Sequence, residues 1–348
     1  DTDRSRGLGD VYKRQVNEDG VVTSHHAGKV TITVRVKESK KKAKHHITIE
    51  DIPYTSIEFA KNNPVSLESG TSHKMQLVTG PANATDHRIK WTSSNKTAAT
   101  VDENGTVTAL RPIETVTITA VYKTNPALTC SWNLKITRTK GYITKQMLDN
   151  LDLTAIKKVM ITAHPDDETL WGGGHLLEGE YLVVCMTHGW NPKRRTAFEQ
   201  TMRTTNDKYL ILDYPDVRKT FSNGKYETDM LSTCKNAMQE DINLILSYKK
   251  WDLIATHNPF GEYGKFLHKT ISQMVTQCYN KMTNKSATLY YFGRYYNSSN
   301  KIPGKQIAPE LLAIKNSMVG RYYPTAKGAI DAFGHMIPYE NWLLPSEW

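Results

Sequence analysis

A histidine and three carboxylates are concentrated at one point of the sequence, in the run AHPDDE at residues 163–168. Because the run follows an apolar, strand-like segment, its polar groups would need partners if they were buried. A divalent metal would supply them, since His164 and Asp167 stand three residues apart across a proline turn and can both face one ion. Asp166 would then be left to act on a bound water, which is the chemistry of a metal-dependent hydrolase.

A third ligand is expected from another strand end, because zinc in hydrolases takes about three protein ligands and keeps one position for water. The segment NPFGEYGKFLHK follows the apolar run WDLIATH and places His268 on the first turn of a helix. The set of His164, Asp167 and His268 favours Zn²⁺ by ligand type, although iron or another divalent metal would accept it. Spacing alone leaves a second interpretation open, in which the aspartates cap a helix and the histidine is unrelated.

The elements that must position these residues alternate between buried strands and amphipathic helices. Strands are predicted for KKVMITA at 157–163, YLVVCMT at 181–187, WDLIATH at 251–257 and TLYYFGRY at 288–295. Helices are predicted at 168–178, 193–210, 229–248 and 266–282. This order indicates an α/β domain with a mostly parallel sheet covered on both faces, whose ligands bind beyond the carboxyl ends of the strands.

The run AHPDDE, the glycines at 172–174 and the later GEYG stretch with its histidine resemble the PIG-L/LmbE family of N-acetylglucosaminyl deacetylases. The resemblance spans most of residues 156–340 and implies a Rossmann-like domain that binds zinc through His164, Asp167 and His268, with Asp166 as general base. It implies removal of an N-acetyl group from an N-acetylglucosamine-type glycan or glycoconjugate. Some relatives act on amides of non-sugar thiol conjugates instead, and the substrate loops have no readable code that would exclude this.

Other positions also fit the family's pattern, among them Thr187-His188-Gly189, the Arg195 helix and Tyr214-Pro215-Asp216. The candidates for contact with substrate are Arg195, Asp216, Tyr263, His257 and His188. One position departs from the pattern, because Lys265 stands where the family has a histidine.

Lys265 can stabilise an oxyanion as a fixed cation, but a lysine is a poor proton shuttle near neutral pH unless its pKa falls. We therefore predict a catalytic role for Lys265 beside Asp166, with His257 or His188 as substitutes for the missing histidine. The same departure leaves an alternative function open, that of a non-catalytic glycan-binding or adhesive surface protein with a degenerate deacetylase domain.

The front part of the chain has short alternating strands rich in Val, Thr and Ile, and it repeats itself. VNEDGVVT and VTITVRV in the first copy correspond to VDENGTVT and VTITAVY in the second. The second copy, with its WTSSN stretch, resembles the bacterial immunoglobulin-like repeat of group 2, which implies a β-sandwich with Trp91 between its sheets. Asp19-Gly20 and Asn104-Gly105 are each expected to supply the pair of positive φ angles that a tight hairpin needs.

The predicted segments follow from these patterns. Residues 1–15 are interpreted as an assembly artefact, because DVYKRQ looks like a translated transposon end, and 16–52 as a truncated Ig-like repeat. The complete repeat is predicted at 53–138, a linker at 139–155 and the deacetylase domain at 156–348. Such repeats are typical of secreted and surface proteins, so we expect a protein that is secreted or lies at the cell surface of a bacterium, with any signal peptide missing.

Composition limits the function classes. With 39% hydrophobic and 23% charged residues the chain is that of a globular protein, and no apolar run is long enough to span a bilayer. The net charge of +10 is spread along the chain, and no nucleic-acid module is visible. A basic surface would suit wall polymers or acidic glycans. The resemblance to the deacetylase family implies an N-acetylated sugar or glycan as substrate, and the Ig-like repeats are expected to hold a cell-wall polymer.

Overall fold

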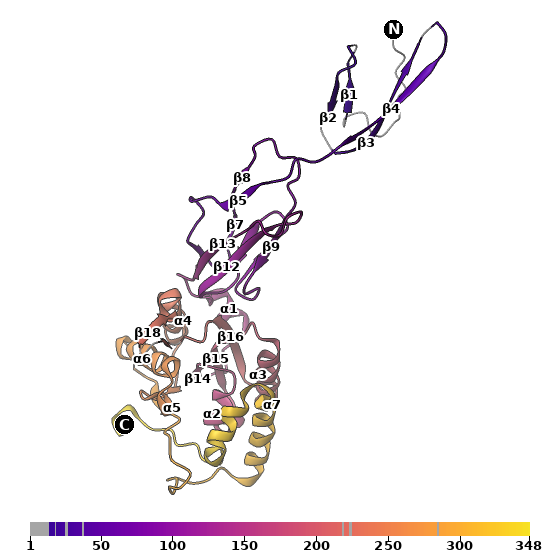
Figure 1. Ribbon diagram of the computed structural model, residues 1–348. Coiled ribbons are helices and arrows are strands. Elements are labelled where there is room, and N and C mark those ends of the chain that lie inside the picture. The colour runs from indigo at the N-terminus through magenta and orange to yellow at the C-terminus, as the bar shows by residue number, and fades with distance from the viewer. Residues whose placement is uncertain are drawn as a thin grey trace.

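The computed structural model describes residues 14–17, 19–24, 27–36, 38–217, 219–222, 225–283 and 285–348. It is elongated, with β-structure from the N-terminal side leading into a helix-covered domain that carries the C-terminus (Figure 1). Residues 1–13, which make up most of the segment interpreted as an assembly artefact, lie outside the described residues.

The chain begins with two antiparallel hairpins. They are β1 (Arg14–Val16) with β2 (Val22–Ser24), and β3 (Gly28–Arg35) with β4 (Lys42–Ile49). The described side chains of β2, β3 and β4 are exposed or half-buried. The interpretation of residues 16–52 as part of an Ig-like repeat stays a prediction.

A β-sandwich follows. Its strands are β5 (Ser56–Phe59), β6 (Ser66–Glu68), β7 (Ser72–Lys74), β8 (Leu77–Gly80), β9 (Ile89–Ser93), β10 (Ala99–Val101), β11 (Thr106–Ala109), β12 (Ile113–Tyr122) and β13 (Thr129–Thr137). One sheet has the order β6-β13-β12-β9, another β10-β11-β7, and β5 pairs with β8. Side chains on β12 alternate between buried and half-buried, as expected for a strand with one face on a core. Val107 and Ile118 belong to that core, and Trp91 packs against it as predicted.

The same turn occurs in both copies of the repeated motif. Gly105 donates its N–H to the carbonyl of Asp102, and Asp102 Oδ1 accepts the N–H of Thr106 at 2.7 Å. Asn17 and Gly20 make the corresponding bonds in the first copy. Gly105 takes a φ of 80°, but Asn104 is not among the described residues with positive φ. The prediction of a positive-φ pair is therefore wrong for this copy, because the loop is one residue longer and needs the left-handed conformation only at its last position.

The second domain is built on five parallel strands in the order β16-β15-β14-β19-β20. They are β14 (Lys158–Thr162), β15 (Tyr181–Thr187), β16 (Lys208–Tyr214), β19 (Leu253–His257) and β20 (Thr288–Phe292). β17 (Lys219–Ser222) and β18 (Lys225–Asp229) form a separate hairpin. The order of the strands along the chain reverses between β14 and β19, so the connections that leave these two strands diverge.

Helices cover both faces of this sheet (Figure 1). They are α1 (Lys145–Asn150), α2 (Asp167–Leu177), α3 (Pro192–Thr205), α4 (Lys235–Tyr248), α5 (Gly261–Gly264), α6 (Phe266–Lys281) and α7 (Pro309–Phe333), with 3₁₀ turns at Met230–Thr233, Gly334–Met336 and Pro345–Glu347. On β14, Val159 and Ile161 face the core shared with α1, α4 and α6, whereas Met160 faces the core shared with α2, α3 and α7. Both faces are apolar because each side of a parallel sheet must be covered.

Several segments differ from the sequence-based expectation. The helix predicted at 229–248 begins at Lys235, after a 3₁₀ turn, and α7 is not predicted by the sequence pattern. The helix predicted at 193–210 ends at Thr205, where Asn206 takes a left-handed conformation, and KYLILDY then forms the edge strand β16. The segment predicted as a linker, 139–155, instead contains α1, and Ile143 and Leu148 are buried in the core of the second domain. None of the helices within the described residues is both long and apolar enough to cross a membrane.

A test of the sandwich is possible at Gly105. A Cβ there would lie 2.6 Å from the Trp91 ring, whereas Gly70, also at positive φ, has nothing within 4 Å. Both Gly→Ala changes put an L-residue into a left-handed backbone conformation, which lowers the free energy of unfolding by about 1–2 kcal/mol. Gly105→Ala adds an overpacking cost of about 1–3 kcal/mol.

Urea unfolding of the full chain, followed by circular dichroism, should show a larger loss of unfolding free energy for Gly105→Ala than for the control Gly70→Ala. Equal losses would mean that Trp91 is not held against this turn.

Candidate metal centre

The cluster lies at the carboxyl ends of the two central strands. His164 and Asp167 come directly after β14, and His268 stands in the first turn of α6, beyond the end of β19. Because β14 and β19 are adjacent and parallel, these residues meet at the same edge of the sheet. The divergence of α2 and α6 to opposite faces opens a crevice at this edge, where ligands bind in open α/β sheets.

The three predicted ligands are brought together. His164 Nδ1 lies 2.9 Å from His268 Nε2 and 3.3 Å from Asp167 Oδ2, and His268 Nε2 lies 3.5 Å from Asp167 Oδ2. Donor atoms placed about 2.0–2.1 Å from a tetrahedral zinc are about 3.3 Å apart. All three side chains are buried. The donor types and their separations therefore fit a zinc ion.

The second nitrogen of each histidine is held by a carboxylate. His164 Nε2 lies 3.1 Å from Asp216 Oδ1, and His268 Nδ1 bonds Glu262 Oε2. Such carboxylate partners fix the ring orientation of metal-binding histidines and make the free nitrogen more basic. Glu262 is buried and takes a φ of 56°, a conformation that costs free energy in a non-glycine residue. In this backbone conformation the carboxylate of Glu262 lies between the imidazoles of His257 and His268.

Among the described residues, two further groups bring histidine and acidic donor atoms within 4.8 Å of one another. The group of His257, Glu262 and His268 is saturated by hydrogen bonds. His257 Nε2 accepts the N–H of Ala163 at 2.9 Å, so its proton is on Nδ1, which donates to Glu262 Oε1 at 2.9 Å. The group of His164, His188 and Asp216 is less buried than the predicted one. The group of His164, Asp167 and His268 is therefore the candidate ion site that agrees with the sequence-based prediction.

Asp166 is placed differently from its neighbour Asp167. It takes a φ of 141°, and its carboxyl lines the pocket. Burial and the adjacent carboxylate of Asp167 raise the pKa of Asp166 to about 7. Its backbone N–H donates to Glu168 Oε2 at 3.0 Å, and Glu168 Oε1 accepts the hydroxyl of Tyr322 on α7. Glu168 thus ties the start of α2 to α7 and holds the turn that presents Asp166.

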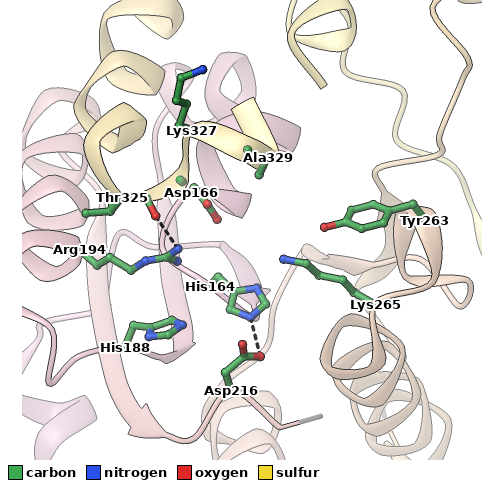
Figure 2. A pocket seen from close by; sticks show the side chains of 12 residues that line it. His164, Asp166, His188, Arg194, Asp216, Tyr263, Lys265, Thr325, Lys327 and Ala329 are labelled. Atoms are coloured by element: carbon green, nitrogen blue, oxygen red, sulfur yellow. Dashed lines mark hydrogen bonds and ion pairs between the residues drawn. The ribbon is translucent and has the colours of Figure 1, made fainter. Parts of the chain in front are cut away.

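A cavity of about 270 Å³ opens over the cluster. Figure 2 shows Lys265 and Tyr263 on one side of it, His188 and Arg194 on the other, and His164 between them. It is lined by His164, Asp166, His188, Arg194, Asp216, Tyr263, Lys265, Thr325, Ala326, Lys327, Gly328 and Ala329.

Two lining residues have shifted pKa values of opposite sign. Although burial alone would lower it, the nearby carboxylate of Asp167 raises the pKa of Lys265. Burial and the charge of Arg194 lower the pKa of His188 to about 3. Near neutral pH, Lys265 is therefore a fixed cation and His188 a neutral imidazole.

Two of the predicted substrate residues do not reach the pocket. His257 is fully buried with both ring nitrogens bonded and does not line the pocket, so the structure does not bring it together with the other predicted substrate residues. Arg195 turns away and donates Nε to the carbonyl of Gly189 at 2.5 Å, while Arg194 lines the pocket and donates to the carbonyl of Thr325 (Figure 2). Adjacent residues on a helix point about 100° apart, so the pattern could not decide which arginine faces inward.

Three predicted residues do line the pocket, namely Asp216, Tyr263 and His188, together with Lys265. Sequence reasoning missed Glu262 and Arg194. A signal for Glu262 exists, since it lies in the GEYG stretch between the strand and the ligand histidine.

The β-sandwich touches the loop that carries His188. The guanidinium of Arg111 lies 4.5 Å from the ring centroid of Trp190, and Arg111 is itself held by Thr97 at 2.7 Å. A backbone bond from Arg138 to the carbonyl of Thr233, at 2.7 Å, also joins the domains. The sandwich therefore docks on the second domain through a loop that borders the pocket.

Comparison with known families identifies residues 53–131 as a bacterial Ig-like domain of group 2. Uncharacterized protein L374 of Acanthamoeba polyphaga mimivirus is 31% identical over 175 residues, which cover 45% of this chain and 67% of that protein. Uncharacterized protein CA_P0160 of Clostridium acetobutylicum is 32% identical over 117 residues, which cover 33% of this chain and only 12% of that protein.

Several solved structures resemble parts of the chain. Domains 4 and 5 of the S-layer protein SbsC share 18% identity over 37% of this chain and 67% of that chain, with a TM-score of 0.21. Invasin, a bacterial integrin-binding protein, shares 23% over 33% of this chain and 26% of its own, with a TM-score of 0.20. A GH10 xylanase from termite gut with a bacterial Ig-like domain shares 15% over 66% and 61%, with a TM-score of 0.18. These TM-scores are too low to support a conclusion about activity.

The carboxylate partners can be tested through zinc affinity. Glu262→Gln keeps the size of the side chain but leaves one acceptor oxygen for two histidines, so zinc should bind about 10- to 100-fold more weakly. The measurement is a chelator competition on the full chain. Glu178→Gln, at an exposed glutamate after α2, should bind zinc like the wild type, and His268→Ala should lose the ion.

An unchanged affinity in Glu262→Gln would contradict the assignment of His268 as a ligand oriented by Glu262.

Proposed function

This chain belongs to the same family as the uncharacterized protein L374 of Acanthamoeba polyphaga mimivirus, and we propose that its second domain is a zinc-dependent hydrolase of N-acyl bonds. The proposed substrate is an N-acetylglucosamine-type glycan or glycoconjugate. The proposed fold of this domain is Rossmann-like, in agreement with the parallel strand order β16-β15-β14-β19-β20.

One observation carries the proposal. Two buried histidines each direct one nitrogen at a shared point beside Asp167 and have the other nitrogen held by a carboxylate, while Asp166 remains without a role in that set and lines the pocket. Asp166 is thus a second buried carboxyl that the three-residue set does not need. In a metal-dependent hydrolase, some residues bind the ion and a separate residue acts as acid and base. The proposal gives the first role to His164, Asp167 and His268 and the second to Asp166.

The ion would supply a Lewis acid for the acyl carbonyl and a water of lowered pKa. Asp166 accepts the proton of the attacking water as the new C–O bond forms, and returns it to the nitrogen as the C–N bond breaks. Acetate and the free amine are the products. Asp166 suits this role because it is a carboxyl that lines the pocket beside the ligand set and can both take and give a proton.

Lys265 stabilises the negative charge that develops on the acyl oxygen when the acyl carbon becomes tetrahedral. Its pKa is raised, so it stays protonated and can donate hydrogen bonds without giving up its proton. His188, kept neutral by burial and Arg194, accepts a hydrogen bond from the substrate. The two groups lie on opposite sides of the pocket, so the substrate would be held between them (Figure 2).

The Ig-like domain at 53–131 supports a protein that works outside the cell or at its surface. We place a cell-wall polymer as the partner of this β-structure, which would keep the pocket near the glycan. The aligned residues cover 67% of the mimivirus protein L374 and 12% of the Clostridium protein CA_P0160. The proposed partners refer to this chain alone.

Asp166→Asn tests the base. The variant should keep about one zinc per chain, because the ligand set is untouched, and should lose about 10²- to 10⁴-fold in acetate release from N-acetylglucosamine oligomers. Zinc content is measured by mass spectrometry and acetate by a coupled assay. Loss of the zinc would place Asp166 among the ligands, and full activity would remove it as the base.

Lys265 tests whether the site is an enzyme at all. Lys265→Ala should lower turnover by about 10²- to 10³-fold with unchanged zinc content, as for loss of one oxyanion donor. Lys265→His should retain activity, and Lys281→Ala, at the exposed end of α6, serves as the control.

Wild-type turnover in Lys265→Ala would assign the oxyanion to another donor. If Lys265→His releases acetate and the wild-type chain does not, the result would favour the alternative of a glycan-binding protein without turnover.

A further inference from the structure

Exposed aromatic side chains gather at one rim of the pocket. Tyr263, which lines the pocket, is 50% exposed, and Tyr295, beyond the end of β20, is 44% exposed. Both rings pack on the buried ring of Phe333, with centroid separations of 5.0 and 6.0 Å. Since both contact the ring of Phe333, the two exposed tyrosines belong to one aromatic cluster, and Tyr263 joins that cluster to the pocket.

The positions of these rings are fixed from more than one side. The ring of Tyr295 also lies 6.4 Å from that of His335, whose Nε2 bonds the carbonyl oxygen of Tyr296 at 2.8 Å. Tyr263 stands in the short loop between β19 and α6, beside Lys265. Rings that are already fixed lose little conformational entropy when a ligand packs on them.

The pocket is too small for a long substrate. Its volume of about 270 Å³ is at the lower end for ligand sites, which run from about 300 to 1,000 Å³. It can take an acyl group and the ring that bears it, so any continuation of the substrate must leave over the rim. A monosaccharide or a small thiol conjugate held in the pocket would leave Tyr295 unused, because Tyr295 does not line the pocket.

We propose that Tyr263 and Tyr295 form a subsite for further pyranose rings, so that the substrate is an oligomeric or polymeric N-acylated glycan. The apolar face of a pyranose packs on an aromatic ring, and the phenol hydroxyl can bond the sugar hydroxyls, which suits tyrosine better than an aliphatic side chain. This inference rests on the proposed function for the pocket below the rim.

The test measures affinity apart from turnover. The zinc-loaded full chain carrying Asp166→Asn is titrated by calorimetry with N-acetylglucosamine and with its β-1,4-linked tetramer. The tetramer should bind roughly 3- to 10-fold more tightly for each ring that stacks. Adding Tyr295→Ala should lower the gain by the share of one stacked ring, about 3- to 10-fold, whereas Tyr295→Phe should keep most of it.

Tyr323→Ala is the matched control. Tyr323 is 42% exposed on α7 but contacts Lys327 and not Phe333, so the gain with chain length should persist. Equal affinity for the two sugars, no binding of either, or an unchanged gain in Tyr295→Ala would overturn the subsite.

Acetate release by the wild-type chain separates this inference from the proposed function. Release without any effect of chain length would leave the hydrolase and remove the subsite. A gain that depends on Tyr295, with no release from any oligomer, would keep the subsite and remove the hydrolase.

Discussion

The buried carboxylate of Asp167 is the constraint on which the second domain depends. Its Oδ2 lies 3.3–3.5 Å from ring nitrogens of His164, His257 and His268, and also accepts the N–H of His164 at 2.7 Å. A buried charge without partners costs several kcal/mol, so the surrounding groups must be held in place. Asp167 is also the first residue of α2, so the positive end of the helix dipole stabilises its negative charge. The fold holds these groups in place through the central strands, the strained turn at Asp166 and the carboxylates bonded to the far nitrogens of the histidines. A cation among these donors would balance the negative charge.

The two domains are coupled at the edge of the pocket. Arg111 of the sandwich is almost fully buried against Trp190, which follows His188 by two residues. His188 has a φ of 65°, and its Nδ1 has no hydrogen-bond partner among the described residues, so the loop that carries it holds backbone strain and an unpaired polar atom. Contact from the sandwich is one of the interactions that keep this loop in place. The Ig-like domain therefore contributes to the shape of the pocket in addition to any role as a spacer.

Sequence reasoning found the parts of the site that are close together in the chain and missed those that depend on packing. AHPDDE and His268 could be predicted because a strand end and a helix start confine them, and the strands β15 and β20 begin where their apolar runs begin. The sequence pattern predicts the start of β16 as the end of a helix, because KYLILDY is a short apolar run and pairing with the neighbouring strand β15 decides its type. Arg194 and Arg195 are adjacent, and only the packing of α3 against α7 shows which one faces the pocket. The role of Glu262 depends on a φ that no local pattern predicts.

The most direct test of the zinc assignment is an anomalous difference map from crystals of the full chain grown with zinc, recorded at the zinc absorption edge. We predict one peak at about 2.0–2.2 Å from His164 Nδ1, an oxygen of Asp167 and His268 Nε2. Asp216 and Glu262 should remain on the far nitrogens of the two histidines. A peak held by His188 and Asp216 instead, or no peak at this crevice in a chain folded as described, would contradict the account.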